Sequence, residues 1–380
     1  MKILVTGSAG FIGKNLVARL NNIKNGRDKT TDLTENLEIF EYDLDMTEEQ
    51  LDDWCKSADF VVHLAGVNRP ENTEEFEQGN TMFTGDVLNY LNKHKNKCPV
   101  LVSSSTGALS DTPYGRSKKA AESFVFAHGE AMESPVYIYR FPNVFGKWCR
   151  PKYNSAVATF CNNIANDLPI EINDESTELT LIYIDDLVNE IINAICGKAN
   201  MEGDFAQVQP VYTKTLGEIA ALLKSFRANR EDMGLPDLAD EFTLKLHAAY
   251  TSYLPPEALA KPLKMNVDER GSFTEIFRTQ HHGQMSVNIS KPHITKGNHW
   301  HDTKNEQFLV VQGSGVIRLR RIFDEEIFEY HVSGDKPEII DIPVGYTHNI
   351  ENLGDTDMVT LMWCNECFNP KKPDTFFEKI

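Results

Sequence analysis

The sequence has no apolar run near the ~20 residues that a membrane-spanning helix needs. No small-residue cleavage site follows the short apolar stretch at the N-terminus, so this stretch predicts a buried strand and not a signal peptide. Basic residues are also few, with 38 lysines and arginines against 56 acidic residues and a net charge of −18. Such a charge disfavours nonspecific binding to nucleic acid or anionic membranes. We therefore expect a cytoplasmic protein that binds neither.

The sequence also has few cysteines that lie close to another cysteine. The seven cysteines are scattered and odd in number, which predicts reduced thiols and not a disulfide framework. Cys364 and Cys367 form one Cys-x-x-Cys, but the second pair that a four-thiolate zinc site requires is absent from the sequence. We interpret these two thiols as packed side chains on a late strand.

The length of 380 residues exceeds one ordinary core and predicts two domains. Up to about residue 250, strand patterns alternate with helical patterns, which predicts a parallel sheet covered on both faces. Thr47 and Gln50 mark a capping box at one of these helices. The expected strands are residues 2–6, 37–44, 58–66, 99–105 and 136–141.

The pattern changes at the proline-rich stretch SYLPPEALAKP, which begins at residue 252 and predicts a linker. Short strands with turn signals follow it, without long helical periods, as in an all-β sandwich or barrel. We therefore expect a Rossmann-type α/β domain over residues 1–254 and an all-β domain over residues 255–380.

Glycines at positions 7, 10 and 13 form G-x-x-G-x-x-G between a strand and a helix. Gly7 permits the tight turn, Gly10 lets the backbone approach a pyrophosphate, and Gly13 lets the helix pack closely. The phosphates would then meet the unpaired N–H groups of the helix N-terminus. The context at the first strand predicts a dinucleotide-binding fold.

Tyr114 and Lys118 form Y-x-x-x-K, and residues four apart share one face of a helix. An ammonium beside a phenol lowers the phenol pKa, and the tyrosine can then exchange a proton with a substrate oxygen. A surface pair is the alternative, but the preceding serine strand favours catalysis. Ser105 is the first candidate for a hydrogen bond to the substrate oxygen, and Ser104 is the second.

Further motifs support this interpretation. Residues 1 to about 250 resemble the extended short-chain dehydrogenases/reductases that act on nucleotide sugars. The resemblance is carried by TGSAGFIG (6–13), HLAG (63–66), Asn80, SSS (103–105), YGRSK (114–118), RFPNVFG (140–146) and LIYIDDL (181–187). It implies that the cofactor contacts Gly7, Gly10, Phe11, Ile12, Gly13, Lys14, Asp43, Leu44, Leu64, Ala65 and Lys118. It also implies substrate contacts at Asn80, Arg140 and Asn143.

Two residues bear on the choice of cofactor. Asp43 is the residue that we expect to contact the adenine, and an acid at the end of the second expected strand favours NADH because it accepts from the ribose 2′-hydroxyl. Lys14, directly after Gly13, would instead meet a 2′-phosphate. The resemblance favours NADPH over NADH.

The stretch HWHDTKNE (299–306) predicts a metal site in the second domain. His299 and His301 are two apart and point to the same face of a strand, and Glu306 and His348 complete a set of four. Two histidines alone would suggest a surface cluster. Three histidines with one carboxylate suit a borderline divalent metal, and we expect Zn²⁺.

This second region resembles the cupin barrels, and DERGSFTEIFR (268–278) resembles the opening of sugar-nucleotide 3,5-epimerases. The whole chain resembles the CapF/WbjC type of bifunctional capsular-polysaccharide enzyme. That type implies a UDP-linked 2-acetamido-2,6-dideoxy-4-ketohexose as substrate. The cupin domain would epimerise C3, and the Rossmann domain would reduce C4 with NADPH to a UDP-N-acetyl-6-deoxy-L-talose type sugar. We expect a homodimer.

Other functions remain open. The first alternative is a single-activity 4-ketosugar reductase with a regulatory or dimerising cupin. The second is a non-catalytic, redox-sensing nucleotide binder. The third is a reductase whose barrel is a metal-dependent oxygenase or isomerase. The intact Tyr114–Lys118 pair argues against the nucleotide binder. The epimerase base is also open among His299, His301 and Tyr346.

Overall fold

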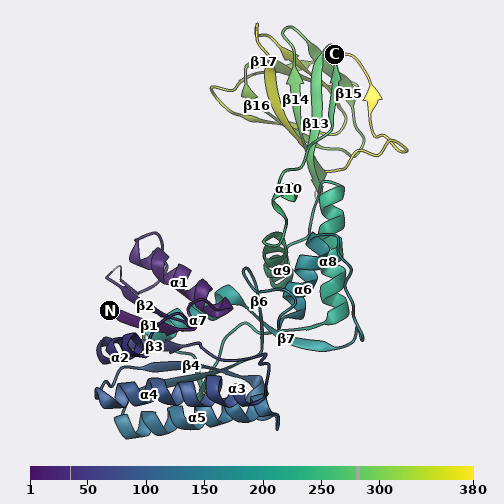
Figure 1. Ribbon diagram of the computed structural model, residues 1–380. Helices are drawn as coiled ribbons and strands as arrows, with labels where there is room; N and C mark the ends of the chain where they lie inside the picture. The colour runs from purple at the N-terminus through teal and green to yellow at the C-terminus, as the bar shows by residue number, and fades with distance from the viewer. Residues whose placement is uncertain (35, 280–282) are drawn as a thin grey trace. The chain divides into compact units, whose positions relative to one another are not determined.

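The computed structural model describes residues 1–34, 36–279 and 283–380 (Figure 1). The chain divides into two compact units. The first comprises Met1–Leu223 and Glu241–Leu254, and the second comprises Lys224–Asp240 and Pro255–Ile380. Among the described residues, no helix has the length and apolar character that crossing a bilayer requires.

The first unit is built on a sheet with strand order β2-β1-β3-β4-β5-β9-β8. Its neighbours from β2 to β9 pair in parallel, and only β8 is antiparallel. The predicted parallel sheet is therefore confirmed. The strands are β1 (Lys2–Thr6), β2 (Glu38–Tyr42), β3 (Phe60–His63), β4 (Val100–Ser105), β5 (Val136–Phe141), β8 (Met201–Glu202) and β9 (Phe205–Ala206).

Helices cover both faces of this sheet because its strands are apolar on both sides (Figure 1). Ile3 and Val5 pack with α1 and α7 on one face, while Leu4 packs with α2, α4 and α5 on the other. Thr47 and Gln50 form the predicted capping box of α2. The covering helices are α1 (Phe11–Lys24), α2 (Glu48–Ser57), α4 (Phe83–Lys93), α5 (Pro113–Met132) and α7 (Ile184–Ile195).

Shorter elements complete this part of the chain. A π-helical turn (Glu77–Met82) connects α3 (Glu74–Phe76) to α4. A small sheet has the order β10-β7-β6. Its strands and the remaining helices are β6 (Asn143–Phe145), β7 (Glu178–Tyr183), β10 (Tyr212–Thr215), α6 (Ala156–Ala165), α8 (Leu216–Glu231) and α9 (Glu241–Thr251).

The second unit is rich in β-strands, as predicted, and forms two sheets. One has the order β11-β13-β14-β21-β16-β19, with β12 paired to β13, and the other has the order β18-β17-β20-β15-β22. The first sheet contains β11 (Gly234–Leu235), β12 (Met265–Asp268), β13 (Gly271–Thr279), β14 (Gly283–Ser290), β16 (Glu306–Gln312), β19 (Ile339–Ile342) and β21 (Met358–Cys364). The other contains β15 (Thr295–Trp300), β17 (Ser314–Arg321), β18 (Ile327–Ser333), β20 (Tyr346–Asn352) and β22 (Phe376–Phe377).

Inward-facing side chains of both sheets form the core of this unit. Phe308 and Val310 of one sheet pack with Ile317, Leu319 and Ile350 of the other. The expected linker contains a short helix, α10 (Pro256–Leu259). The grouping of Lys224–Asp240 with this unit was not predicted; β11 within it pairs with β13.

Candidate active and metal sites

The glycine loop is packed tightly against the segment that follows β3. Gly7 has φ of +70°, and a Cβ atom there would lie 2.7 Å from the backbone nitrogen of Ala65. A Cβ on Gly13 would lie 2.1 Å from the carbonyl oxygen of Gly7. Neither position can accept a side chain without moving the backbone, which explains the spacing of the motif.

Asp43 follows β2 and reaches this loop. Its carboxylate accepts hydrogen bonds from the backbone nitrogens of Ala9 at 2.7 Å and Leu44 at 2.9 Å. Asp43 and Lys14 border one open hollow of about 670 Å³, whereas the Leu44 side chain is fully exposed. The hollow is lined by Ser8, Ala9, Lys14, Val17, Ala18, Glu41, Asp43, Asp45, Met46 and Trp148.

Trp148 in this lining was not predicted. It has φ of +67°, which is rare for a bulky residue, and its side chain is about half exposed. The backbone on either side is held, because Tyr253 donates to the carbonyl oxygen of Cys149 at 2.7 Å and Asn15 donates to that of Lys147 at 3.3 Å. No local pattern marks such a residue, since its place depends on contacts from residues that are distant in the sequence.

Tyr114 and Lys118 lie in the first two turns of α5, which Thr112 caps. Lys118 is buried and donates to the carbonyl oxygen of Ser103 at 3.2 Å. Burial lowers the Lys118 pKa to about 8, although the Glu122 carboxylate opposes that shift. Burial raises the pKa of Tyr114, and a hydrogen bond with Ser105 opposes it. Burial is therefore the largest influence on the Tyr114 pKa in this arrangement, and the effect of Lys118 on the phenol stays a prediction.

The serine strand presents its hydroxyls to opposite sides. Ser105 reaches Tyr114 and also accepts from the backbone nitrogen of Gly107 at 3.0 Å. Ser104 instead donates to the buried carboxylate of Glu122. The structure thus brings the first serine candidate, and not the second, to the tyrosine.

The three residues that we expect to contact the substrate form hydrogen bonds with other protein groups in this structure. Arg140 makes two hydrogen bonds to Glu122, at 2.9 and 2.6 Å, so its guanidinium is engaged inside the domain. Asn80 is buried and hydrogen-bonds the backbone of Val67 and the hydroxyl of Ser117. Asn143 is exposed and donates to the carbonyl oxygen of Thr180 at 3.3 Å.

Asn80 and Lys118 also meet the HLAG segment. A Cβ on Gly66 would lie 2.8 Å from Oδ1 of Asn80 and 3.0 Å from Nζ of Lys118. His63 of the same segment is buried between the hydroxyls of Thr6 at 2.7 Å and Thr84 at 3.0 Å. Burial lowers the His63 pKa to about 3, so this histidine is a neutral brace between β1 and α4.

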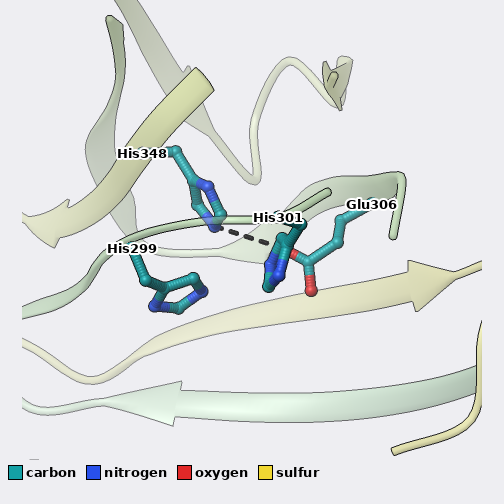
Figure 2. A group of neighbouring side chains, drawn as sticks. All are labelled: His299, His301, Glu306 and His348. Atoms are coloured by element: carbon teal, nitrogen blue, oxygen red, sulfur yellow. Dashed lines mark hydrogen bonds and ion pairs between the residues drawn. The ribbon is translucent and has the colours of Figure 1, made fainter. Parts of the chain in front are cut away.

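All four residues of the expected metal site come together in the second unit (Figure 2). One ligand atom from each of His299, His301, Glu306 and His348 lies within 4.8 Å of the others. His299 and His348 are cross-strand partners on β15 and β20. Glu306 begins β16 in the other sheet, so the cluster joins the two sheets.

The chemistry of this cluster fits a cation. Nδ1 of His348 is buried without a hydrogen-bond partner among the described residues, and its Nε2 lies 3.1 Å from Oε2 of Glu306 without hydrogen-bond geometry. Burial lowers the His299 pKa to about 4, which keeps its imidazole in the neutral form that binds metals. Burial alone would raise the Glu306 pKa, but the adjacent His301 and His348 hold it well below its usual range.

A cavity of about 370 Å³ opens beside this cluster. It is bordered by His299, Glu306 and His348 and by two cationic residues, Arg270 and Lys296. Nζ of Lys296 is held at 2.8 Å by Oδ1 of Asn288 and by the carbonyl oxygen of Ile289. Tyr346, an open candidate for a base, is not part of the cavity lining and accepts from Arg321 at 2.7 Å.

Comparison with known proteins gives the relationships of both units. Residues 3–203 match the model of the NAD dependent epimerase/dehydratase family. The chain belongs to this family. Residues 266–376 match the polysaccharide biosynthesis C-terminal domain.

Two relatives extend over the whole chain. A UDP-2-acetamido-2,6-beta-L-arabino-hexul-4-ose reductase of Pseudomonas aeruginosa is 40% identical over 376 residues, covering 99% of this chain and 98% of that one. The crystal structure of the capsular polysaccharide assembling protein CapF from Staphylococcus aureus is 53% identical, with a TM-score of 0.92 and complete coverage of both chains. These matches confirm the resemblance to CapF-type enzymes.

A third comparison concerns the fold alone. A UDP-glucuronic acid 4-epimerase from Bacillus cereus is 20% identical with a TM-score of 0.53, covering 67% of this chain and 96% of that one. Its likeness agrees with the Rossmann-like architecture of the first unit.

Proposed function

We propose that the chain is a bifunctional nucleotide-sugar enzyme of capsular polysaccharide synthesis, with one reaction in each unit. The observation that carries this proposal is the 40% identity, over almost the whole length of both chains, to a UDP-4-ketosugar reductase. The substrate is a UDP-linked 2-acetamido-2,6-dideoxy-4-ketohexose, and the product is of the UDP-N-acetyl-6-deoxy-L-talose type. The enzyme acts as a homodimer.

The first unit reduces the C4 ketone. Bound NADPH would supply the hydride. Tyr114 supplies the proton to the ketone oxygen, because the phenol is protonated at neutral pH even at its ordinary pKa of about 10. Ser105 holds the same oxygen, and Lys118 maintains positive charge beside the reacting groups. Lys14 distinguishes the 2′-phosphate of NADPH, while Asp43 orients the loop that carries Ala9.

The second unit inverts C3 in a cupin-type barrel made by its two sheets. The 4-ketone acidifies the C3 proton, so a base in the cavity can remove it and an acid can return it to the other face. The residues His299, His301, Glu306 and His348 would hold Zn²⁺, which would supply positive charge at the cavity wall. Arg270 and Lys296 offer positive charge for an anionic substrate, which the acidic chain as a whole would repel.

Proton NMR of the full chain with the UDP-4-ketosugar in deuterated water tests the two activities. Without NADPH, we expect deuterium to enter C3 while the ketone persists. With NADPH, we expect the reduced sugar. Reduction without any C3 exchange would instead favour the single-activity reductase with a regulatory barrel. Dependence of the exchange on oxygen would favour the oxygenase alternative.

Elemental analysis tests the metal. We expect about one zinc ion per chain in purified protein and its loss in His301→Ala. Because metal-ligand bonds contribute to folding stability, the melting transition of the second unit should also fall in this variant. Metal-free protein with full epimerase activity, together with unchanged melting of the variant, would refute the metal site.

A further inference from the structure

One short segment contacts the surroundings of the metal cluster at several points. We call residues 374–378 the strap. The carboxylate of Asp374 accepts hydrogen bonds from the backbone nitrogens of Asp302 at 2.9 Å, Thr303 at 2.8 Å and Lys304 at 2.9 Å. It also accepts from the Thr303 hydroxyl at 3.2 Å. These residues form the loop that joins His301 to Glu306, so one side chain fixes the connection between two ligands.

The backbone of Asp374 contacts a ligand directly. Its carbonyl oxygen is hydrogen-bonded to Nδ1 of His301. Because a carbonyl only accepts, this contact assigns the proton to Nδ1 and leaves the Nε2 lone pair available. Nε2 of His301 lies 3.3 Å from Oε2 of Glu306, on the side where the four ligand atoms converge. The contact therefore selects the tautomer and the ring orientation that a metal requires.

The rest of the strap holds the strand that carries His299. Phe377 pairs with His299 and Phe376 pairs with Trp300 across β22 and β15. The rings of Phe376 and Trp300 have centroids 4.8 Å apart. Glu378 continues the contact, since its carbonyl oxygen accepts from the hydroxyl of Thr347, the neighbour of His348.

We infer that Asp374 is a positioning residue of the metal site, which sets its affinity for a divalent cation by fixing the His301–Glu306 loop and the His301 ring. This inference rests on the proposed metal site. The Asp374 carboxylate is already occupied by three backbone donors and a hydroxyl, so its contribution is orientation and not ligation. Partners of this kind typically change metal affinity by about 10- to 100-fold when they are removed.

The test uses the full chain, stripped of metal and titrated with zinc against a chelator of known affinity. Asp374→Asn keeps the shape of the side chain but replaces one acceptor oxygen with an NH₂ group, which cannot accept from the loop. Glu378→Gln is the matched control, because it lies in the same strap and its carboxylate pairs instead with Arg320 at 2.8 Å. We expect Asp374→Asn to weaken zinc binding by about 10- to 100-fold and Glu378→Gln to leave it nearly unchanged.

Two further measurements separate positioning from general stabilisation. Cobalt(II) in place of zinc reports ligand geometry through its visible absorption, which should change in Asp374→Asn and not in Glu378→Gln. Metal-free melting of Asp374→Asn measures the stability lost with the loop hydrogen bonds alone, and Asp374→Glu should recover part of the lost zinc affinity. Equal zinc affinity in Asp374→Asn and the wild type would overturn the inference, as would equal losses in both variants. A wild-type chain that takes up no zinc would overturn the metal site and the inference together.

Discussion

Replacing Tyr114 with phenylalanine separates the reduction of the ketone from the folding of the first unit and its binding of NADPH. The ring would keep its packing, including the contact with Phe76 at 5.6 Å between centroids. The lost hydroxyl would remove one hydrogen bond with Ser105, which costs only about 0.5–1.5 kcal/mol of stability. The loss of the proton donor should be larger. A general acid contributes at least ~10²-fold, or about 2.7 kcal/mol of barrier.

NADPH oxidation at 340 nm with saturating ketosugar measures this barrier directly. We expect the reduction rate of Tyr114→Phe to fall by ~10²-fold or more, with NADPH binding and C3 deuterium exchange near wild-type values. Tyr90→Phe on α4 is the control and should leave all three unchanged. Reduction by Tyr114→Phe within a few-fold of wild type would refute the assignment of the proton donor. Equal loss of C3 exchange would show that the variant had damaged more than the reductase.

Two further substitutions test how the first unit is held together. Glu122→Gln should lower the free energy of unfolding by about 3 kcal/mol or more, because it leaves the Arg140 guanidinium without its carboxylate partner. Denaturant unfolding measures this loss. A loss below about 1 kcal/mol would contradict a structural role for the ion pair. Thr47→Ala should cost about 1 kcal/mol by removing the side chain that caps α2 at Gln50, and an unchanged denaturation midpoint would show that the cap contributes nothing.

Local patterns predicted much of the first unit because its chemistry follows the chain. Gly7 and Gly13 are glycines for reasons that lie within a few residues or at the next strand, and the strand and helix patterns around them are strong. Tyr114 and Lys118 are one helical turn apart, so their shared face follows from spacing alone. In the second unit, His299, His301 and Glu306 are similarly close in sequence, and the cluster forms as expected.

The missed features depend on distant contacts. Glu122 was not predicted to have a role, but it is buried and binds both Ser104 and Arg140. Ser104 and Arg140 lie on two adjacent strands. The alternating side-chain directions along one strand therefore could not reveal which serine points away from Tyr114. Asp374 is 73 residues from the histidine that its carbonyl contacts. No local pattern distinguishes it from other acidic residues near a turn.

The burial of Lys118 was also not predicted, and it leads to a test by pH. Spacing suggested that the ammonium would act on the phenol. Tyr114 is half-buried and Lys118 is buried, and burial lowers the Lys118 pKa from its ordinary 10.5 to about 8. Between these two pH values the unfolded chain binds a proton that the folded chain does not. Stability therefore rises with pH over this window, and below about pH 8 the folded protein carries a buried charge at a cost.

The melting temperature of the cofactor-free protein, measured from pH 7.5 to 10.5, tests this dependence of stability on pH. The wild type is compared with two lysine variants. Lys118→Met removes the titrating group and should reduce the rise of stability with pH relative to the wild type. Lys119→Met is the matched control, because Lys119 is exposed on the same helix and should leave the rise intact. Reduction should be impaired only in Lys118→Met. If the wild type and Lys118→Met have the same pH dependence, Lys118 stays charged in the folded protein throughout the window, and burial does not control its charge.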